Sequence, residues 1–341
     1  MLAGEARAAA LDWARCRTEP GFRGAYLAGS TADRPADAVQ PPWSDVDVTV
    51  VVAGTAPPKP GKIRHHGALL DVSYLPEELL ADPDRVAATH YLAPSFAGPD
   101  GVLLDPTGLL GRLRAAIAPT YDSPGARRRR VADVLTAIRM RLSAIDAAAR
   151  WPQQVQAWLF PSTLGTVAAL VAAGERPTVR LRFRRARDVL HDRPGGYARM
   201  LELLGCAGVD AGVVVRHLDR LGDLFDEAAA VGSTPFPFSS DISAEARPIA
   251  IDGSRALVDA GDHREAVFWI VATFARCQQV LDADAPPERS RAAERAFRDA
   301  LAELTGVRGP DDLRARSSAT VALLPELEDV AATIVGSRQT K

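Results

Sequence analysis

Three aspartates and a Gly-Ser pair are the residues of this sequence whose types and spacing suit them for chemistry. Asp45 and Asp47 stand two residues apart in a valine-rich run, Asp71 stands in another apolar run, and Gly29-Ser30 follows a third. Carboxylate oxygens are the ligands that hard divalent cations such as Mg²⁺ prefer. Glycine lets the backbone approach a phosphate closely, and serine offers backbone and hydroxyl donors to the same oxygens. Together these residues predict a site for a divalent cation and a phosphate group.

Strands are the elements expected to position the three carboxylates. In residues 45–52, valine fills every even position, while Asp45 and Asp47 begin the odd series. This alternation predicts a strand with one apolar face, on which the two aspartates share the other face, about 7 Å apart. A single further strand is expected over residues 63–74, with Asp71 facing away from the core.

The rest of the chain is expected to be mainly helical. A helix over residues 3–17 and a strand over 25–28 precede the aspartates, and from residue 126 onward apolar residues recur at helical spacing. Further helices are expected at 153–173, 178–191, 210–230, 262–282, 287–305 and 318–335, whereas the proline-rich segment 233–240 cannot continue a helix. The pattern predicts an α+β chain with a small mixed-sheet domain, residues 1–122, followed by an all-helical domain, residues 123–341.

The order of these motifs resembles that of the nucleotidyltransferase superfamily of the DNA polymerase beta type. In that pattern a Gly-Ser turn follows one strand, Asp-x-Asp stands on the next, and a third carboxylate stands on a further strand; here these are Gly29-Ser30, Asp45-Val46-Asp47 and Asp71. A small catalytic domain followed by a helical domain is also similar to the plan of antibiotic and minimal nucleotidyltransferases.

The resemblance implies an enzyme that uses two Mg²⁺ ions and a nucleoside triphosphate. Asp45 and Asp47 would hold the metal at the triphosphate, and all three aspartates would hold the metal that activates the acceptor hydroxyl. Gly29 and Ser30 would bind the nucleotide. The expected reaction moves AMP from ATP to a hydroxyl of a small molecule, with the helical domain forming part of the acceptor pocket.

One departure from the family pattern keeps other functions open. Fourteen residues separate Ser30 from Asp45, a longer connection than the family usually has. The alternatives are a noncatalytic nucleotide-binding or regulatory protein of the same fold, and a toxin/antitoxin-type transferase that acts on RNA or protein.

Two further residues are candidates for the site. Arg34 is a candidate nucleotide contact in the long loop, although a solvated loop arginine is the simpler interpretation. Glu265 is a candidate general base for the acceptor hydroxyl. Because Asp262 precedes it by three residues, a capping box at a helix start explains the same pair equally well.

Several other conspicuous residues are interpreted structurally. The arginine runs 127–130 and 180–187 are expected to be solvated helix faces. His65 and His66 are interpreted as strand-edge residues, with His65 about 20 Å from Asp71 along one strand. The aromatic residues of the stripe at 267–274 are expected to pack in the core.

Bulk composition is that of a soluble globular protein. The formal net charge of −2 gives no global attraction to nucleic acid, and the cysteines at 16, 206 and 277 have no metal-ligand spacing. The first residues lack a secretory signal pattern, and apolar runs are broken before the length of a membrane span. We therefore expect a cytoplasmic protein that does not insert in a membrane, whose oligomeric state the sequence does not indicate.

Overall fold

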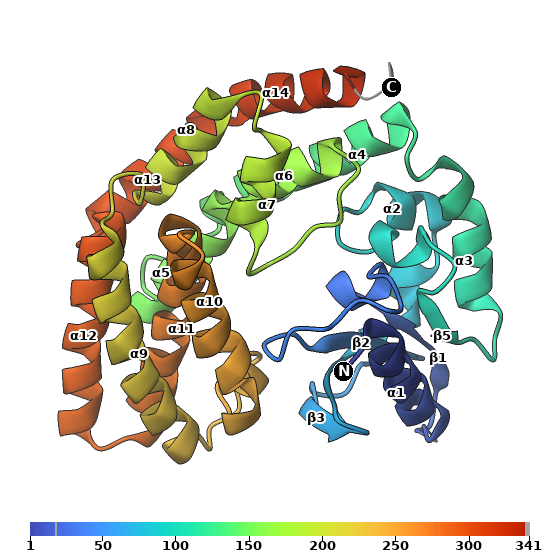
Figure 1. Cartoon of the computed structure of the whole chain (residues 1–341), viewed down its shortest axis with the longest axis horizontal. Coiled ribbons are helices and arrows are strands. Elements are labelled where there is room, and N and C mark those ends of the chain that lie inside the picture. The colour runs from blue at the N-terminus through green and yellow to red at the C-terminus, as the bar shows by residue number, and fades with distance from the viewer. Residues whose placement is uncertain (18, 338–341) are drawn as a thin grey trace. The chain divides into compact units, whose positions relative to one another are not determined.

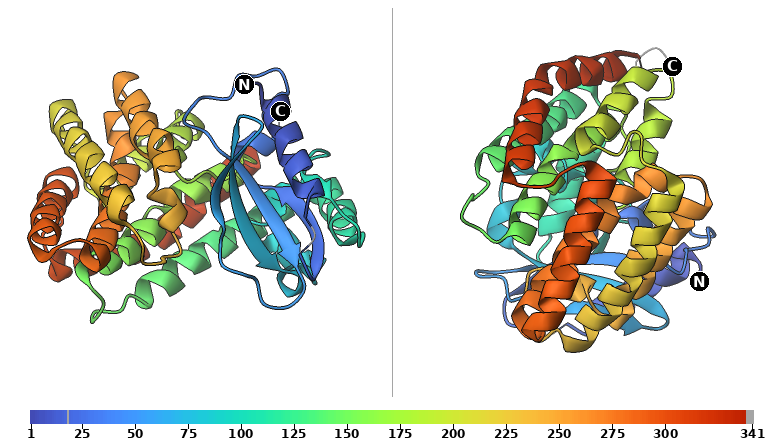
Figure 2. Two further views of the ribbon diagram at one scale, coloured as in Figure 1. Left: turned by 90° about the horizontal axis from the view of Figure 1, so that it is seen from below. Right: turned by 90° about the vertical axis from the view of Figure 1, so that its left-hand side faces the viewer.

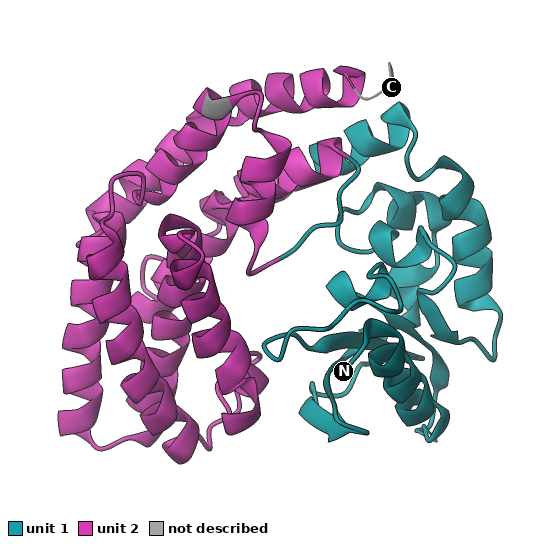
Figure 3. Ribbon diagram, viewed as in Figure 1, with its two compact units in different colours: residues 1–133, 174–178 teal, residues 134–173, 179–341 magenta. Residues whose placement is uncertain are grey.

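A computed structural model describes residues 1–17 and 19–337 of the chain and has the expected α+β composition. The chain divides into two compact units (Figure 3). Unit 1 contains Met1–Asp133 and Gly174–Thr178, and unit 2 contains Val134–Ala173 and the chain from Val179 onward. The division after Asp133 falls inside one helix, and a short later segment returns to unit 1.

Unit 1 is built on a five-stranded sheet of order β3-β4-β2-β1-β5 (Figure 1). Strands β2 and β4 are parallel, and the other neighbours are antiparallel. The strands are β1 (Phe22–Leu27), β2 (Val46–Val52), β3 (Gly61–His65), β4 (Ala68–Pro76) and β5 (Val102–Leu104). The helices are α1 (Ala3–Arg15), α2 (Pro83–Ala88), α3 (Leu109–Ile117) and the first half of α4 (Pro124–Ser143), with short 3-10 helices η1 (Ser30–Ala32), η2 (Glu77–Leu80), η3 (Ala93–Phe96) and η4 (Ala118–Thr120).

Both faces of this sheet are covered by helices. The even-numbered valines of β2 are buried against Trp13 and the alanines of α1, which lies along one side of the sheet in Figure 2. Val51, on the opposite face of β2, is buried in a second cluster with residues of α2, α3 and η3. The predicted apolar face of β2 is thus confirmed, and the aspartates start on the face that carries Val51.

The single strand expected over residues 63–74 is wrong. The structure has a hairpin in which β3 and β4 pair antiparallel, with Lys62 opposite Asp71 and His65 opposite Ala68. The turn residues His66 and Gly67 both have positive φ, 46° and 81°, as a type I′ turn requires. The sequence estimate of 20 Å between His65 and Asp71 does not apply, because the chain reverses between them.

Unit 2 contains only helices among its described residues. They are the second half of α4, α5 (Trp151–Ser162), α6 (Leu164–Ala172), α7 (Arg182–Val189), α8 (Pro194–Leu204), α9 (Ala211–Val231), α10 (Gly253–Asp259), α11 (His263–Asp284), α12 (Pro287–Thr305), α13 (Pro310–Ala322) and α14 (Leu324–Ser337), with 3-10 helices η5 (Ser239–Asp241) and η6 (Ala244–Ala246) and a π-helix η7 (Pro248–Asp252). Helices α8 and α10 were not expected from the sequence.

Two expected helices are each divided in the structure. The helix expected at 318–335 corresponds to the end of α13 and to α14, which begins at Leu324. Pro325 lacks the N–H that an unbroken helix would need there, whereas a proline is tolerated in a first turn. The helix expected at 153–173 is likewise divided at Thr163, two residues after Pro161.

The aromatic stripe of α11 is core, as predicted. Phe268, Trp269 and Phe274 are 0%, 9% and 1% exposed. The stretch Trp151–Ala172 is long and apolar enough to cross a membrane by composition alone, but 83% of its most apolar window is buried inside the protein. Such burial is typical of the core helices of soluble proteins.

Candidate metal centre

Asp45, Asp47 and Asp71 converge in unit 1. One carboxylate oxygen from each lies within 4.8 Å of those of the other two. The parallel pairing of β2 and β4 places Asp47 directly opposite Asp71, and the two-residue period of a strand brings Asp45 to the same side. The three side chains form an oxygen-only set of the kind that holds Mg²⁺ or another hard cation.

The carboxylate of Asp47 is the most electrostatically crowded of the three. Among the described residues it accepts no hydrogen bond and forms no ion pair. Burial, and then the charges of Asp45 and Asp71, raise the pKa of Asp47 to about 7, against the opposing effect of two lysines. A cation bound between the carboxylates would supply the missing partner.

Two lysines that the sequence analysis did not identify contact the outer aspartates. Lys62 Nζ lies 2.5 Å from Asp45 Oδ2 and 3.3 Å from Asp71 Oδ2, and Lys59 Nζ lies 2.7 Å from Asp71 Oδ1. The side chain of Lys62 is only 3% exposed. The turn at His66-Gly67 places Lys62 opposite Asp71. A two-residue turn at this point of the sequence is therefore the feature that predicts the contact between Lys62 and Asp71.

Gly29 lies directly against the Asp47 carboxylate. Its φ is 63°, and a Cβ at this position would lie 1.8 Å from Asp47 Oδ2. The neighbouring Ala28 N–H donates to the Asp47 carbonyl at 2.9 Å. The Gly-Ser turn therefore packs directly against the Asp-x-Asp segment, and position 29 has no room for a side chain. Ser30, the first residue of η1, is exposed next to this turn.

The long connection between Ser30 and Asp45 is anchored on the backbone of Asp45. The Thr31 hydroxyl donates to the Asp45 carbonyl at 3.1 Å, and the Gln40 side-chain amide donates to it at 3.3 Å. Both side chains are buried, at 1% and 8% exposure. The loop thus helps to hold the first metal ligand, a function that its length alone did not suggest.

Helix α1 holds the outer part of the same loop. Arg7 Nη1 donates to the carbonyls of Thr31 and Arg34 at 3.1 and 2.7 Å. Backbone hydrogen bonds also link the start of the chain to the loop, including Gly4 N–H to the Ala36 carbonyl at 2.9 Å. The loop is therefore an ordered part of unit 1.

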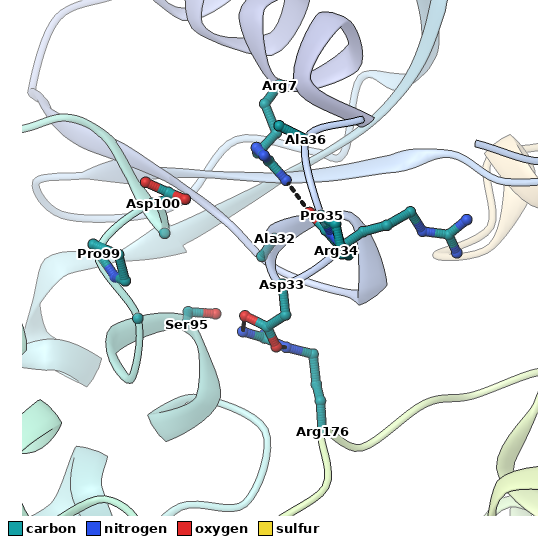
Figure 4. A pocket seen from close by; sticks show the side chains of 12 residues that line it. Arg7, Ala32, Asp33, Arg34, Pro35, Ala36, Ser95, Pro99, Asp100 and Arg176 are labelled. Atoms are coloured by element: carbon teal, nitrogen blue, oxygen red, sulfur yellow. Dashed lines mark hydrogen bonds and ion pairs between the residues drawn. The ribbon is translucent and has the colours of Figure 1, made fainter. Parts of the chain in front are cut away.

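A cavity of about 380 Å³ lies beside this loop, lined by three arginines, two aspartates and loop backbone (Figure 4). Arg176 binds Asp33 through two nitrogens, one of them 2.7 Å from Asp33 Oδ1. The side chain of Arg34 extends away from this pair in Figure 4 and donates to the Val39 carbonyl at 3.2 Å. Arg34 is thus a rim residue of this cavity, and its contact with a nucleotide stays a prediction.

Glu265 belongs to unit 2, where it is 1% exposed. Its Oε1 accepts from the Tyr197 hydroxyl at 2.6 Å and from Arg187 Nη1 at 2.9 Å. Burial, and then the hydrogen bond to Glu265, raise the pKa of Tyr197. These contacts give Glu265 a structural role as the centre of a buried polar network, and its role as a general base stays a prediction.

The capping box expected at the start of α11 is wrong. Asp262 occupies the N-cap position but makes no capping hydrogen bond. Its carboxylate instead accepts from Arg187 at 2.8 Å. Because both acidic residues bind the same guanidinium, their spacing serves an ion-pair network and not a helix cap.

Two members of the arginine runs are buried, contrary to the expectation of solvated faces. Arg130 is 1% exposed, stacks on the Tyr121 ring and donates to the Tyr121 carbonyl. Arg182 is 3% exposed, with its guanidinium 4.2 Å from the centre of the Phe268 ring. Aromatic faces and carbonyl oxygens can partner a buried guanidinium, which a charge pattern in the sequence does not reveal.

No protein-family model and no curated protein matches this chain. Among solved structures, the chain is similar to a nucleotidyltransferase-like protein from Exiguobacterium sibiricum 255-15, at 11% sequence identity over 87% of this chain and 89% of that one, with a TM-score of 0.26. A TM-score of this size carries no argument about fold or activity. The functional conclusion therefore depends on the residues of the metal centre.

Proposed function

We propose that the protein is a metal-dependent nucleotidyltransferase that moves a nucleoside monophosphate, AMP from ATP, to a hydroxyl of a small molecule, with release of pyrophosphate and of the hydroxyl proton. The observation that carries the proposal is the convergence of Asp45, Asp47 and Asp71 beside the Gly29 turn. The Asp47 carboxylate has no hydrogen-bond donor among the described residues, and it lies next to a glycine that has no room for a side chain. This arrangement suits a site for a cation and a phosphate group.

Each residue has a role in this proposal. Asp45 and Asp47 would hold a cation for the triphosphate, and all three aspartates would hold a cation for the acceptor hydroxyl. Magnesium at these carboxylates would neutralise charge on the attacking and leaving oxygens. Gly29 keeps the backbone close to the phosphates, and the exposed Ser30 donates to their oxygens.

The two lysines favour a second candidate, a noncatalytic nucleotide-binding or regulatory protein of the same fold. Lys62 and Lys59 place ammonium groups within 2.5–3.3 Å of the carboxylates of Asp45 and Asp71. In this alternative the ammonium groups replace a divalent cation permanently. In the first proposal the same ammonium groups would bind the phosphates once a cation holds the carboxylates, because phosphate oxygens attract ammonium groups as carboxylates do.

Calorimetric titration with ATP, with and without Mg²⁺, tests whether nucleotide binding depends on the metal centre. We expect magnesium-dependent ATP binding by the wild type and its loss in the Asp45→Asn, Asp47→Asn double variant. Asp37→Asn, which removes an exposed carboxylate from the same loop, is the matched control and should bind as the wild type does. ATP binding that is absent from the wild type, or unchanged in the double variant, contradicts the proposal.

Incubation with ATP labelled in the adenine ring then tests transfer and identifies the acceptor class. Label on a small hydroxyl compound supports the proposal as stated. Label on RNA or on protein supports a toxin/antitoxin-type transferase. ATP binding without any transfer of label supports the noncatalytic candidate.

A further inference from the structure

A second group of metal-ligating side chains lies at the β3–β4 turn, in unit 1. The Nε2 atoms of His65 and His66 lie 2.8 and 3.0 Å from the same oxygen, Asp12 Oδ2. One ligand atom from each of the three residues lies within 4.8 Å of the other two. Asp12 comes from α1, which contacts β3 (Figure 1). The sequence interpretation of both histidines as strand-edge residues misses this convergence.

We propose that Asp12, His65 and His66 form a binding site for a divalent transition metal such as Zn²⁺. Imidazole nitrogen and carboxylate oxygen are standard zinc ligands, and two histidines with one carboxylate leave a fourth position for water or another ligand. Mg²⁺ prefers oxygen ligands, so this site differs in chemistry from the three aspartates. The inference does not depend on the proposed transferase activity.

The turn geometry explains why two consecutive histidines face one carboxylate. Side chains of successive strand residues point to opposite faces. Among the described residues, His66 is the non-glycine residue with positive φ, at 46°, and this left-handed conformation redirects its side chain. The two imidazole rings meet edge to face with centroids 4.3 Å apart. The hairpin thus presents both rings to Asp12.

The separations fit a tetrahedral ion after small movements. Zinc–nitrogen bonds of about 2.0–2.1 Å place neighbouring tetrahedral ligands about 3.4 Å apart. The distances from each Nε2 to Asp12 Oδ2 are 2.8 and 3.0 Å, so each nitrogen needs to separate from this oxygen by only a few tenths of an ångström. The side chains are 26%, 68% and 52% exposed for His65, His66 and Asp12, which leaves a path for the ion.

Metal binding here would fasten the β3–β4 hairpin to α1. His65 is the last residue of β3, and Lys62 stands three residues earlier on the same strand. Because a ligand that binds only the folded state stabilises it, zinc should raise the melting temperature of the protein. The effect should require the histidines and not the three aspartates of the first centre.

Zinc titration of tag-free protein, in competition with a chromophoric chelator, tests the site. We expect one Zn²⁺ to bind the wild type, and His65→Asn or His66→Asn to weaken binding by at least about tenfold, since even second-shell changes cost that much. Asparagine tolerates the left-handed backbone at position 66, so His66→Asn should fold normally, which circular dichroism checks.

Two controls locate the bound ion. His191→Asn removes an exposed histidine from unit 2 and should bind zinc as the wild type does. The Asp45→Asn, Asp47→Asn double variant should also keep its zinc affinity. Equal zinc affinity in the wild type and the His65 and His66 variants would overturn the inference, as would a loss of affinity confined to the aspartate double variant.

Discussion

The backbone of Gly29 and the carboxylate of Asp47 are in such close contact that a Cβ at position 29 would lie 1.8 Å from Asp47 Oδ2. The two residues belong to different motifs of the sequence, yet the position of each restricts the position of the other. The glycine is required for two reasons: its φ of 63° favours glycine, and the carboxylate fills the space of a side chain.

Gly29→Ala should therefore destabilise the protein and disturb the metal centre. We expect a loss of about 2–4 kcal/mol in the free energy of unfolding, from left-handed strain together with displacement of Asp47. Urea denaturation measures it. Gly98→Ala is the matched control, because a Cβ there meets no atom within 4 Å. If both variants unfold at the same urea concentration, the packing of Gly29 on Asp47 is not a constraint.

Asp47→Asn should stabilise the metal-free protein at alkaline pH. The pKa of Asp47 is raised from 3.8 to about 7, so between about pH 4 and pH 7 this carboxyl ionises more readily in the unfolded chain than in the folded protein. The wild type therefore loses stability as the pH rises through this range. The variant has no such loss and should be more stable by about 1–3 kcal/mol at pH 8, with no advantage near pH 4.

Thermal unfolding at a series of pH values, in the presence of a chelator, measures this difference. Asp37→Asn changes an exposed side chain and keeps Asp47, so its stability should follow the wild-type pH dependence. An advantage of Asp47→Asn that is the same at pH 4 and pH 8 would show that its origin is not ionisation.

Lys62→Met should increase the affinity of the centre for divalent cations. The ammonium group lies 2.5 and 3.3 Å from the carboxylates of Asp45 and Asp71 and competes with a cation for the same oxygens. Removing one charge at this range should tighten Mn²⁺ or Mg²⁺ binding by about tenfold or more, since an effective dielectric constant near 20 allows a repulsion of several kcal/mol.

Titration with Mn²⁺, followed by electron paramagnetic resonance, measures the change. Arg64→Met removes a positive charge from an exposed position of the same strand and should change the affinity much less. If Lys62→Met binds Mn²⁺ no more tightly than the wild type, cations do not enter between these carboxylates.

Tyr197→Phe should destabilise unit 2 without a direct effect on the metal centre. It removes a 2.6 Å hydrogen bond to the buried carboxylate of Glu265, which should cost about 1–3 kcal/mol. Tyr91→Phe, at a side chain that is 58% exposed, is the control and should be neutral.

Comparison of Glu265→Gln with Tyr197→Phe then tests the role of Glu265 as a general base. A loss of turnover in Glu265→Gln beyond that expected from its instability supports this role.

The sequence by itself predicted the three carboxylates and the local geometry of the candidate metal centre. The two-residue period expected over residues 45–52 placed Asp45 and Asp47 on one face, and the isolated Asp71 in an apolar run indicated a neighbouring strand. These features depend on backbone geometry within a few residues, which is the same in any strand. The helical spacing in α11 likewise predicted its buried aromatic stripe.

Only the tertiary structure decided which distant residues meet. The reversal at His66-Gly67 brought Lys62 to Asp71 and both histidines to Asp12, although no Asn-Gly or Pro-Gly pair marks that turn. Thr31 and Gln40 hold Asp45 through hydrogen bonds from a loop, and the length of that loop in the sequence did not predict these contacts. These contacts depend on strand register and loop closure. A shift of one residue in the register changes every contact between the strands, and the residue types near each position do not specify the register.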